Sequence, residues 1–117
     1  MAVSIDSELL RGSLDLMVLA VLADGPKYGY LIQQQLRDTS GSRVDLQAGT
    51  LYPLLHRLEA DKYVRTRWET ETGRRRKWYE LTAAGRRRLQ DQTRAWQEYV
   101  DCLRAFLGTS APAPRPA

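Results

Sequence analysis

Basic side chains gather in one segment of the chain, residues 62–88, at a density that predicts binding to a polyanion. The segment holds ten of the eighteen Lys and Arg residues and only three acids, Glu69, Glu71 and Glu80. It therefore carries a formal charge of +7, while the other ninety residues sum to −3. A local positive charge of this kind attracts phosphate-rich polymers. The alternative is an Arg-rich surface that contacts only solvent, which is the usual role of a charge run.

The same segment has the pattern of a β-hairpin. Residues 63–69 and 77–81 are rich in β-branched and aromatic side chains, and residues 71–74 between them contain a glycine, so we expect two strands and a turn. Trp68 and Trp78, one in each strand, are expected to anchor the hairpin to the body. The cations at its tip are the expected phosphate contacts: Arg74, Arg75, Arg76 and Lys77.

The residues before the hairpin predict a helix from about residue 48 to residue 61. Its leucines recur on one face, and Pro53 fits the first turn, where a missing N–H does least harm. The opposite face is small, polar and nearly free of carboxylates, as a surface next to phosphates would be. For this helix alone, an ordinary solvent-facing surface is an equal alternative. The side chains expected to contact base edges are Thr50, Tyr52, His56 and Arg57, and the predicted set of DNA contacts also includes Gly49 and Lys27.

Two further helical segments predict association with a second chain. Residues 7–23 are apolar almost all round, so this helix needs burial on more than one side, and Leu10 and Leu14 are candidates for a dimer interface. We expect Gly25-Pro26 to end it and a second helix to follow over residues 28–37. The final helix, residues 83–107 with Thr82 as N-cap, has the a/d spacing of a coiled coil. Its expected seam residues are Trp96, Val100, Leu103 and Leu107.

Composition excludes several classes of protein. One cysteine and one histidine leave no disulfide and no structural zinc site, and no phosphate-binding loop or nucleophile motif is visible. We therefore expect no enzyme, no metal and no cofactor. The longest apolar run, residues 16–22, is too short to span a bilayer, and the start of the chain has no secretory signal pattern, so we expect a cytoplasmic protein. Cys102 is predicted to be a buried, inert thiol, with a redox sensor as the alternative.

The order of elements predicts a mainly α fold with a two-stranded β wing: a winged helix-turn-helix domain followed by a long dimerisation helix. In such domains the third helix enters the major groove and the hairpin lies along the backbone or the minor groove. The expected organisation is a DNA-binding domain over residues 1–82, a dimerisation helix over 83–108 and a disordered tail over 109–117.

Several motifs together resemble the PadR family of bacterial transcriptional regulators. They are Gly25-Pro-Lys-Tyr-Gly-Tyr30, Ala48-Gly-Thr-Leu-Tyr-Pro-Leu-Leu-His-Arg-Leu-Glu59, Gly73-Arg-Arg-Arg-Lys-Trp-Tyr-Glu-Leu-Thr82 and Gly85. The resemblance covers about residues 9–107, in the short form with one C-terminal helix. It implies a dimeric repressor that leaves its pseudo-palindromic operator when a small, often aromatic, ligand binds.

The chain departs from that pattern at two positions. Lys62 stands where a glycine is common, and a left-handed backbone there would cost about 1 kcal/mol relative to Gly. Arg75 stands where the wing often has a proline, which adds charge and loosens the turn.

Alternatives remain for the effector and for the function. Trp96 either flanks a planar ligand between the two final helices or only packs the dimer. Two other functions fit the pattern: a winged-helix module whose basic hairpin binds an acidic protein, and a DNA-binding protein that has no ligand.

Overall fold

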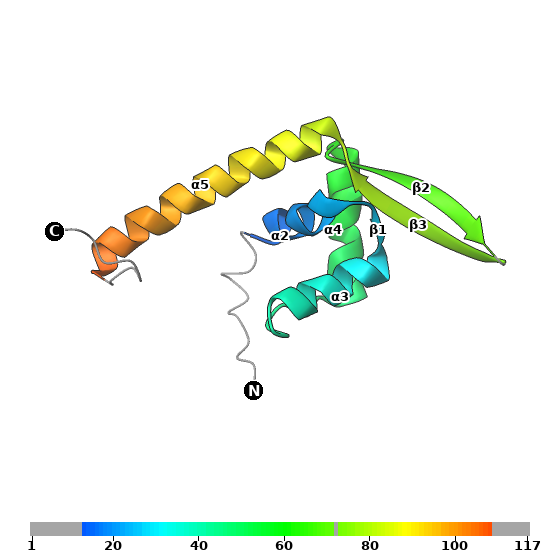
Figure 1. Ribbon diagram of the computed structural model, residues 1–117, viewed down its shortest axis with the longest axis horizontal. Coiled ribbons are helices and arrows are strands. Elements are labelled where there is room, and N and C mark those ends of the chain that lie inside the picture. Colours follow the sequence, from blue (N-terminus) through cyan, green and yellow to red (C-terminus); the bar gives the residue numbers. More distant parts are fainter. Residues whose placement is uncertain (1–12, 72, 109–117) are drawn as a thin grey trace.

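The computed structural model describes residues 13–71 and 73–108, which form a small helical body with a projecting hairpin and a long final helix (Figure 1). Its elements, in chain order, are α2 (Leu14–Val21), the 3-10 turn η1 (Leu22–Asp24), β1 (Lys27–Tyr28), α3 (Gly29–Thr39), α4 (Ala48–Ala60), β2 (Val64–Glu71), β3 (Arg74–Leu81) and α5 (Ala83–Leu107). The predicted fold class is confirmed: the fold is mainly α with a β wing, and it is the winged-helix arrangement.

One apolar cluster holds α2, α3 and α4 together. Leu19 and Leu22 from the first segment meet Ile32 from α3 and Leu51 and Leu55 from α4, and all five are at most 1% exposed. Burying aliphatic side chains of this size stabilises a fold by about 2 kcal/mol each, so the cluster fixes the angle at which α4 presents its other face.

The sheet has three strands, in the order β1-β3-β2, rather than the two that the sequence predicts. The additional strand is β1, whose two residues Lys27 and Tyr28 pair with Tyr79 and Trp78 of β3. A two-residue strand has no periodicity for a sequence pattern to show. The pairing ties the hairpin to the start of α3.

The hairpin is also longer than predicted. Each strand has eight residues, with Val64 opposite Leu81 at the base and Glu71 opposite Arg74 at the tip. Gly73 takes the left-handed backbone of the turn, with a φ of 79°. The cations from Arg74 to Lys77 therefore lie within β3, where side chains alternate between two sides, rather than together on a loop.

The first described helix ends earlier than predicted. It stops at Val21, and η1 continues the chain to Gly25, whose φ of 148° strongly favours glycine. Residues 7–12 of the predicted helix, including Leu10, lie outside the described residues, as does the predicted tail at 109–117.

The junction between the wing and α5 is closely packed. Thr82 is the predicted N-cap: its hydroxyl accepts a hydrogen bond from the Gly85 amide at 2.9 Å and donates one to the Lys62 carbonyl at 2.7 Å. A Cβ on Gly85 would lie 2.0 Å from the Tyr63 carbonyl oxygen, so only glycine fits there without movement. Lys62 has a φ of 67°, the left-handed conformation for which the sequence predicts a cost.

Beyond this junction, α5 extends away from the body, and the molecule measures 62 × 35 × 22 Å (Figure 1). The hairpin projects from the other end of the molecule. The body therefore carries two arms of different character, one strongly basic and one partly apolar.

Candidate nucleic-acid interface

The outer face of α4 is exposed along its whole length. The inner leucines, among them Leu51 and Leu55, are buried, whereas Gly49, Thr50 and Tyr52 face solvent together with Pro53, His56, Arg57 and Ala60. Nothing lies within 4 Å of a Cβ built on Gly49. These exposed positions hold no carboxylate, so a phosphate backbone can approach this face without like-charge repulsion.

Tyr52 is held in a fixed position at the edge of that face. Its hydroxyl lies against Gly29 at the start of α3, so close that a Cβ on Gly29 would lie 2.2 Å from it. The ring remains 42% exposed. Burial raises the pKa of the neighbouring Tyr79 hydroxyl, and the nearby Tyr52 and Glu59 raise it further. Tyr52 is therefore packed on one side and open on the other, as a residue that contacts a ligand must be.

Arg57 is tied to the body as well as exposed. One of its guanidinium nitrogens, Nη2, donates to Asp15 Oδ1 of α2 at 2.5 Å. No local pattern in the sequence indicates this ion pair, because the two residues are 42 positions apart. The pair orients the guanidinium without burying it, since the side chain stays 56% exposed.

The hairpin has two sides with different charge. We call the side that faces α4 the helix-facing side and the opposite one the outer side. The pairing register places Thr66, Trp68, Thr70, Arg75, Lys77 and Tyr79 on the helix-facing side. The outer side has Arg65, Arg67, Glu69, Glu71, Arg74, Arg76, Trp78 and Glu80. All three acids of the hairpin thus lie on the outer side, and the cations of the helix-facing side share it with no acid.

Contacts agree with this assignment. On the helix-facing side, the Thr66 hydroxyl donates to Glu59 of α4 at 2.8 Å and the Lys77 amine lies 3.7 Å from the same carboxylate. On the outer side, Arg65 pairs with Glu80 at 3.0 Å. Arg65 is therefore compensated by an acid of the hairpin itself, whereas the acid next to Lys77 belongs to α4.

The two wing tryptophans differ, and the prediction that both are anchors is wrong for one of them. Trp78 packs edge-on against Tyr28, with ring centres 5.2 Å apart, and its Nε1 donates to Glu69 at 2.9 Å. Trp68 is 54% exposed, and the Arg75 guanidinium lies 4.1 Å from its ring centre. Trp78 thus holds the hairpin to β1, whereas Trp68 belongs to the open surface.

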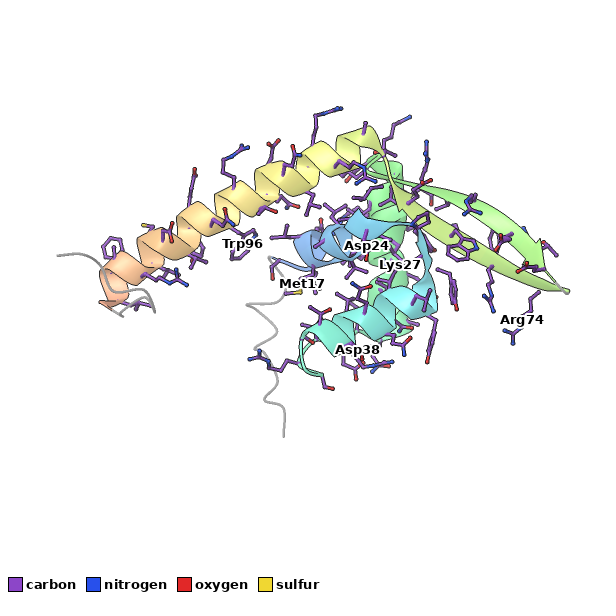
Figure 2. All side chains as sticks on the ribbon, viewed as in Figure 1. Met17, Asp24, Lys27, Asp38, Arg74 and Trp96 are labelled. Atoms are coloured by element: carbon purple, nitrogen blue, oxygen red, sulfur yellow. The ribbon has the colours of Figure 1, made fainter. Side chains whose placement is uncertain are left out.

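Lys27 does not join this surface. Its amine donates to the Val21 carbonyl at 2.8 Å and forms an ion pair with Asp24, whose pKa it lowers, and its side chain is only 14% exposed (Figure 2). The low exposure of Lys27 sets it apart from the ion-paired but open Arg57, and a DNA contact at Lys27 stays a prediction. Arg74, in contrast, lies near the outer end of the wing (Figure 2).

The surface also includes residues that the sequence analysis missed. Tyr30, 56% exposed at the start of α3, and Trp68 line a hollow of about 490 Å³ between α3, α4 and the wing, together with Tyr52, His56 and Arg75. Strand alternation is the signal that could have placed Trp68 on this side, had the register been known.

The outer half of α5 carries exposed apolar side chains. Tyr99 is 56%, Leu103 36%, Phe106 84% and Leu107 66% exposed, while Trp96 and Val100 are half-buried. Trp96 points to the side on which α2 lies (Figure 2), and its ring centre is 5.6 Å from that of Tyr99. Leu14 packs against the core. Cys102 is exposed, so the prediction of a buried thiol is wrong for the single chain.

Within residues 13–71 and 73–108, no three His, Cys, Asp or Glu side chains come together as a metal site would require. None of the described helices is long and apolar enough to cross a membrane.

Comparison with known proteins gives the family. The sequence profile of the Transcriptional regulator PadR-like family matches residues 18–91. The chain is 40% identical over 91 residues to Transcriptional regulator Rv3488 of Mycobacterium tuberculosis, which covers 78% of this chain and 82% of that protein. It is also similar to the crystal structure of a PadR family transcriptional regulator from Eggerthella lenta, with 34% identity, a TM-score of 0.79 and 89% of each chain covered.

A transcriptional regulator from Clostridium thermocellum has a similar structure, with a TM-score of 0.81, 28% identity, and 87% of this chain and 97% of that chain covered. These proteins are regulators of transcription, and the winged-helix geometry described above agrees with that role. This chain belongs to the PadR-like family of transcriptional regulators.

Proposed function

We propose that the protein is a cytoplasmic, homodimeric, sequence-specific repressor whose wings and α4 helices bind a pseudo-palindromic operator and which a small ligand releases. The observation that carries the proposal is the continuity of two surfaces that are basic or neutral: the outer face of α4 and the helix-facing side of the wing, where Glu59 of α4 is shared between Lys77 and Thr66. A duplex offers a groove for a helix and, beside it, a phosphate backbone for such a wing.

The two surfaces have separate tasks. Thr50, Tyr52 and His56 stand on α4 where side chains of a recognition helix reach base edges, and Gly49 lets its backbone come close to the DNA. Arg57, oriented by Asp15, is the fourth candidate reader. Base-edge contacts of this kind determine sequence choice, whereas phosphate contacts supply affinity. The phosphate contacts we assign to the wing are Arg75 and Lys77 on its helix-facing side, together with Arg74 at the tip and Arg76 at the open edge of β3.

A second copy of the chain is the expected cover for the apolar stripe of α5. Trp96, Val100, Leu103 and Leu107 follow the spacing of a coiled-coil seam, and Phe106 at 84% exposed extends the stripe. A contiguous apolar surface on an arm that leaves the body is stabilised when another chain buries it. A two-fold axis through this seam would direct two α4 helices at two half-sites of one operator.

The ligand site proposed here lies against Trp96. A shallow hollow of about 420 Å³ is lined by Trp96, Gln97, Val100, Asp101 and Arg104. A second α5 laid along the stripe would close its open side and leave room for a planar ring against the indole. To release DNA, such a ligand must bind the released form of the dimer more tightly than the DNA-bound form.

DNA binding is tested by fluorescence anisotropy at about 150 mM salt, with the protein's own upstream region and a scrambled fragment of equal length. We expect retention of the upstream fragment alone. Equal and weak retention of both fragments would overturn sequence-specific binding and favour the protein-interaction module. A footprint on the upstream region then locates the two half-sites.

Dimerisation is tested by light scattering at micromolar concentration. We expect a dimer for the native chain and a monomer for Leu103→Asp, because the substitution places a charge in an apolar seam. Arg94→Gln, on the same helix with its side chain 68% exposed, is the matched control and should remain dimeric. A native chain that scatters as a monomer would contradict the proposal.

The ligand site is tested by titrating planar aromatic compounds against the intrinsic fluorescence of the native chain and of Trp96→Ala. Quenching that is lost in Trp96→Ala, together with release of the operator, is the expected result. Unchanged ligand affinity in Trp96→Ala would remove that residue from the site, and the absence of any responding compound would favour a regulator without a ligand.

A further inference from the structure

The hollow between α3, α4 and the wing has the size of a small-molecule site. Its volume is about 490 Å³, within the range of about 300–1,000 Å³ that ligand pockets occupy. Side chains from β1, α3, α4, β2 and β3 line it, so it exists only in the folded domain. It lies at the other end of the body from the α5 arm and its Trp96.

The lining of the hollow combines aromatic rings with cations. Of its ten residues, five are Tyr or Trp, three are Arg or Lys and none is acidic. Tyr30, Tyr52 and Trp68 are each at least 42% exposed, so their rings are open to a ligand. The nearest carboxylate on α4, Glu59, is already shared between Lys77 and Thr66.

The cations are held beside the rings. The Arg75 guanidinium lies 4.1 Å from the ring centre of Trp68, and the Arg76 guanidinium lies 4.7 Å from that of Tyr28. Stacking on a ring occupies the flat face of a guanidinium and leaves its N–H edges free to bind an oxyanion. Arg76 reaches the hollow because β1 pairs only with Trp78 and Tyr79, which leaves the adjoining edge of β3 open.

Base-edge contacts in a duplex account for Tyr52 and His56 on α4, but not for the exposed ring of Trp68 on the wing. A duplex presents phosphates and sugars to a surface beside the recognition helix, and the faces of its bases are stacked on one another. Aromatic rings next to cations are instead what binds an unstacked base and its phosphate.

We propose that this hollow binds a small planar aromatic ring linked to a phosphate, as in a mononucleotide, and that this ligand competes directly with DNA. The ring stacks against Tyr52 and against the face of Trp68 that Arg75 does not cover, and the phosphate is bound by Arg75 and Arg76. Because the same arginines are the proposed DNA phosphate contacts, the two ligands exclude each other. This second route of release acts without any movement of α5. The binding does not depend on the proposed repressor function, and only the competition does.

The first experiment measures binding directly, by isothermal titration calorimetry on the full chain at low salt. The probes are adenosine 5′-monophosphate, adenosine alone and inorganic phosphate alone. We expect the nucleotide to bind at least about tenfold more tightly than either fragment, because ring stacking and phosphate binding add. Nucleotide binding no tighter than phosphate binding would show simple charge attraction and would overturn the proposal.

Two substitutions locate the site. Trp68→Leu should weaken nucleotide binding about tenfold through lost stacking, while leaving phosphate binding unchanged. Arg75→Gln should weaken both, and Arg94→Gln on α5 is its matched control. A thermal melt confirms that each variant is folded, and since Trp68 is 54% exposed we expect no large loss of stability. Unchanged nucleotide affinity in Trp68→Leu would overturn the assignment to this hollow.

The second experiment measures competition by adding the nucleotide to the protein–DNA complex. We expect its addition to weaken the apparent DNA affinity of the native chain and of Trp96→Ala equally. Nucleotide binding without displacement of DNA would overturn the competition, and failure of the chain to bind any DNA would overturn the proposed function while leaving the calorimetric result to stand.

Discussion

The two sides of the wing are made from the same two strands, yet they differ in how their charges are balanced. The helix-facing side has Arg75 and Lys77 and no acid of the hairpin, whereas the outer side has four arginines opposed by three glutamates. The formal charge of the whole segment therefore does not show how the charge is divided: most of the positive charge on the outer side is offset by acids, and that on the helix-facing side is not offset by any acid of the hairpin. Strand alternation, rather than composition, decides which cations are available to an anion.

The difference extends to the aromatic residues. On the outer side Trp78 contacts Tyr28 and Glu69 and joins the hairpin to β1, and on the helix-facing side Trp68 is half exposed beside Arg75. The outer side thus stabilises the hairpin, and the helix-facing side leaves an aromatic ring and a cation exposed for contact with another molecule. Matched substitutions on the two sides should therefore differ in their effects on DNA affinity and on stability.

The largest effect is expected on DNA affinity. Arg75→Gln with Lys77→Gln should weaken operator binding about 100-fold at each half-site, because each charged contact to phosphate contributes about 1.5 kcal/mol. The slope of log affinity against log salt should fall by about two per half-site. Anisotropy titrations at several salt concentrations measure both quantities.

The control is Arg65→Gln with Arg67→Gln, which removes the same charge from the outer side. Arg65 already pairs with Glu80 and Arg67 lies over the Trp78 ring, so a loss below about threefold is expected. Equal losses from the two double variants would break the comparison, since net charge alone would then explain DNA binding.

A smaller effect is expected on stability, and here the outer side of the wing should matter more than the helix-facing side. Trp78→Ala should lower the free energy of unfolding by about 2 kcal/mol, because it removes the ring contact with Tyr28 and leaves Glu69 without its indole donor. Trp68→Ala should cost less than about 1 kcal/mol, since that ring is 54% exposed. Urea unfolding followed by circular dichroism measures both variants. A larger loss for Trp68→Ala would mean that the helix-facing side also stabilises the fold.

A third prediction concerns Lys62, which precedes β2 and lies on neither side. Lys62→Gly should raise the free energy of unfolding by about 1 kcal/mol, because glycine adopts a φ of 67° without a Cβ clash. Lys62→Ala removes the same charge but keeps the Cβ, so it should leave stability nearly unchanged. If Lys62→Ala stabilised as much as Lys62→Gly, charge rather than backbone conformation would be the cause.

Two of the helices, α4 and α5, could be predicted from the sequence nearly to the residue. In α4, four leucines at helical spacing define both the element and its buried face. In α5, Thr82 caps the start, and the residue at the predicted end, Leu107, is followed by the left-handed Gly108. Local patterns were sufficient there because each helix is defined by contacts within a few residues.

The sheet could be predicted only in part. The outer ends of β2 and β3, residues 70–71 and 74–76, consist of Thr, Glu and Arg, which have no strand periodicity of hydrophobicity, and they are ordered by pairing across the turn. The position of Trp68 on the helix-facing side follows from that register and not from its residue type. Likewise, the Arg57–Asp15 pair and the hollow lined by Tyr30 join segments that are far apart in sequence.

The smallest effect on operator affinity is expected from Glu59, the acid of α4 that lies under the helix-facing side. Glu59 of α4 is 3.7 Å from the Lys77 amine and accepts a hydrogen bond from Thr66, so it withholds part of one cation from DNA. Glu59→Gln keeps an acceptor for Thr66 and releases Lys77, so operator affinity should rise about threefold, with a steeper salt dependence. Glu80→Gln, which removes the partner of Arg65 on the outer side, should leave affinity unchanged within error. A gain from Glu80→Gln equal to that from Glu59→Gln would place the DNA on both sides of the wing, and the distinction between the two sides would then concern stability alone.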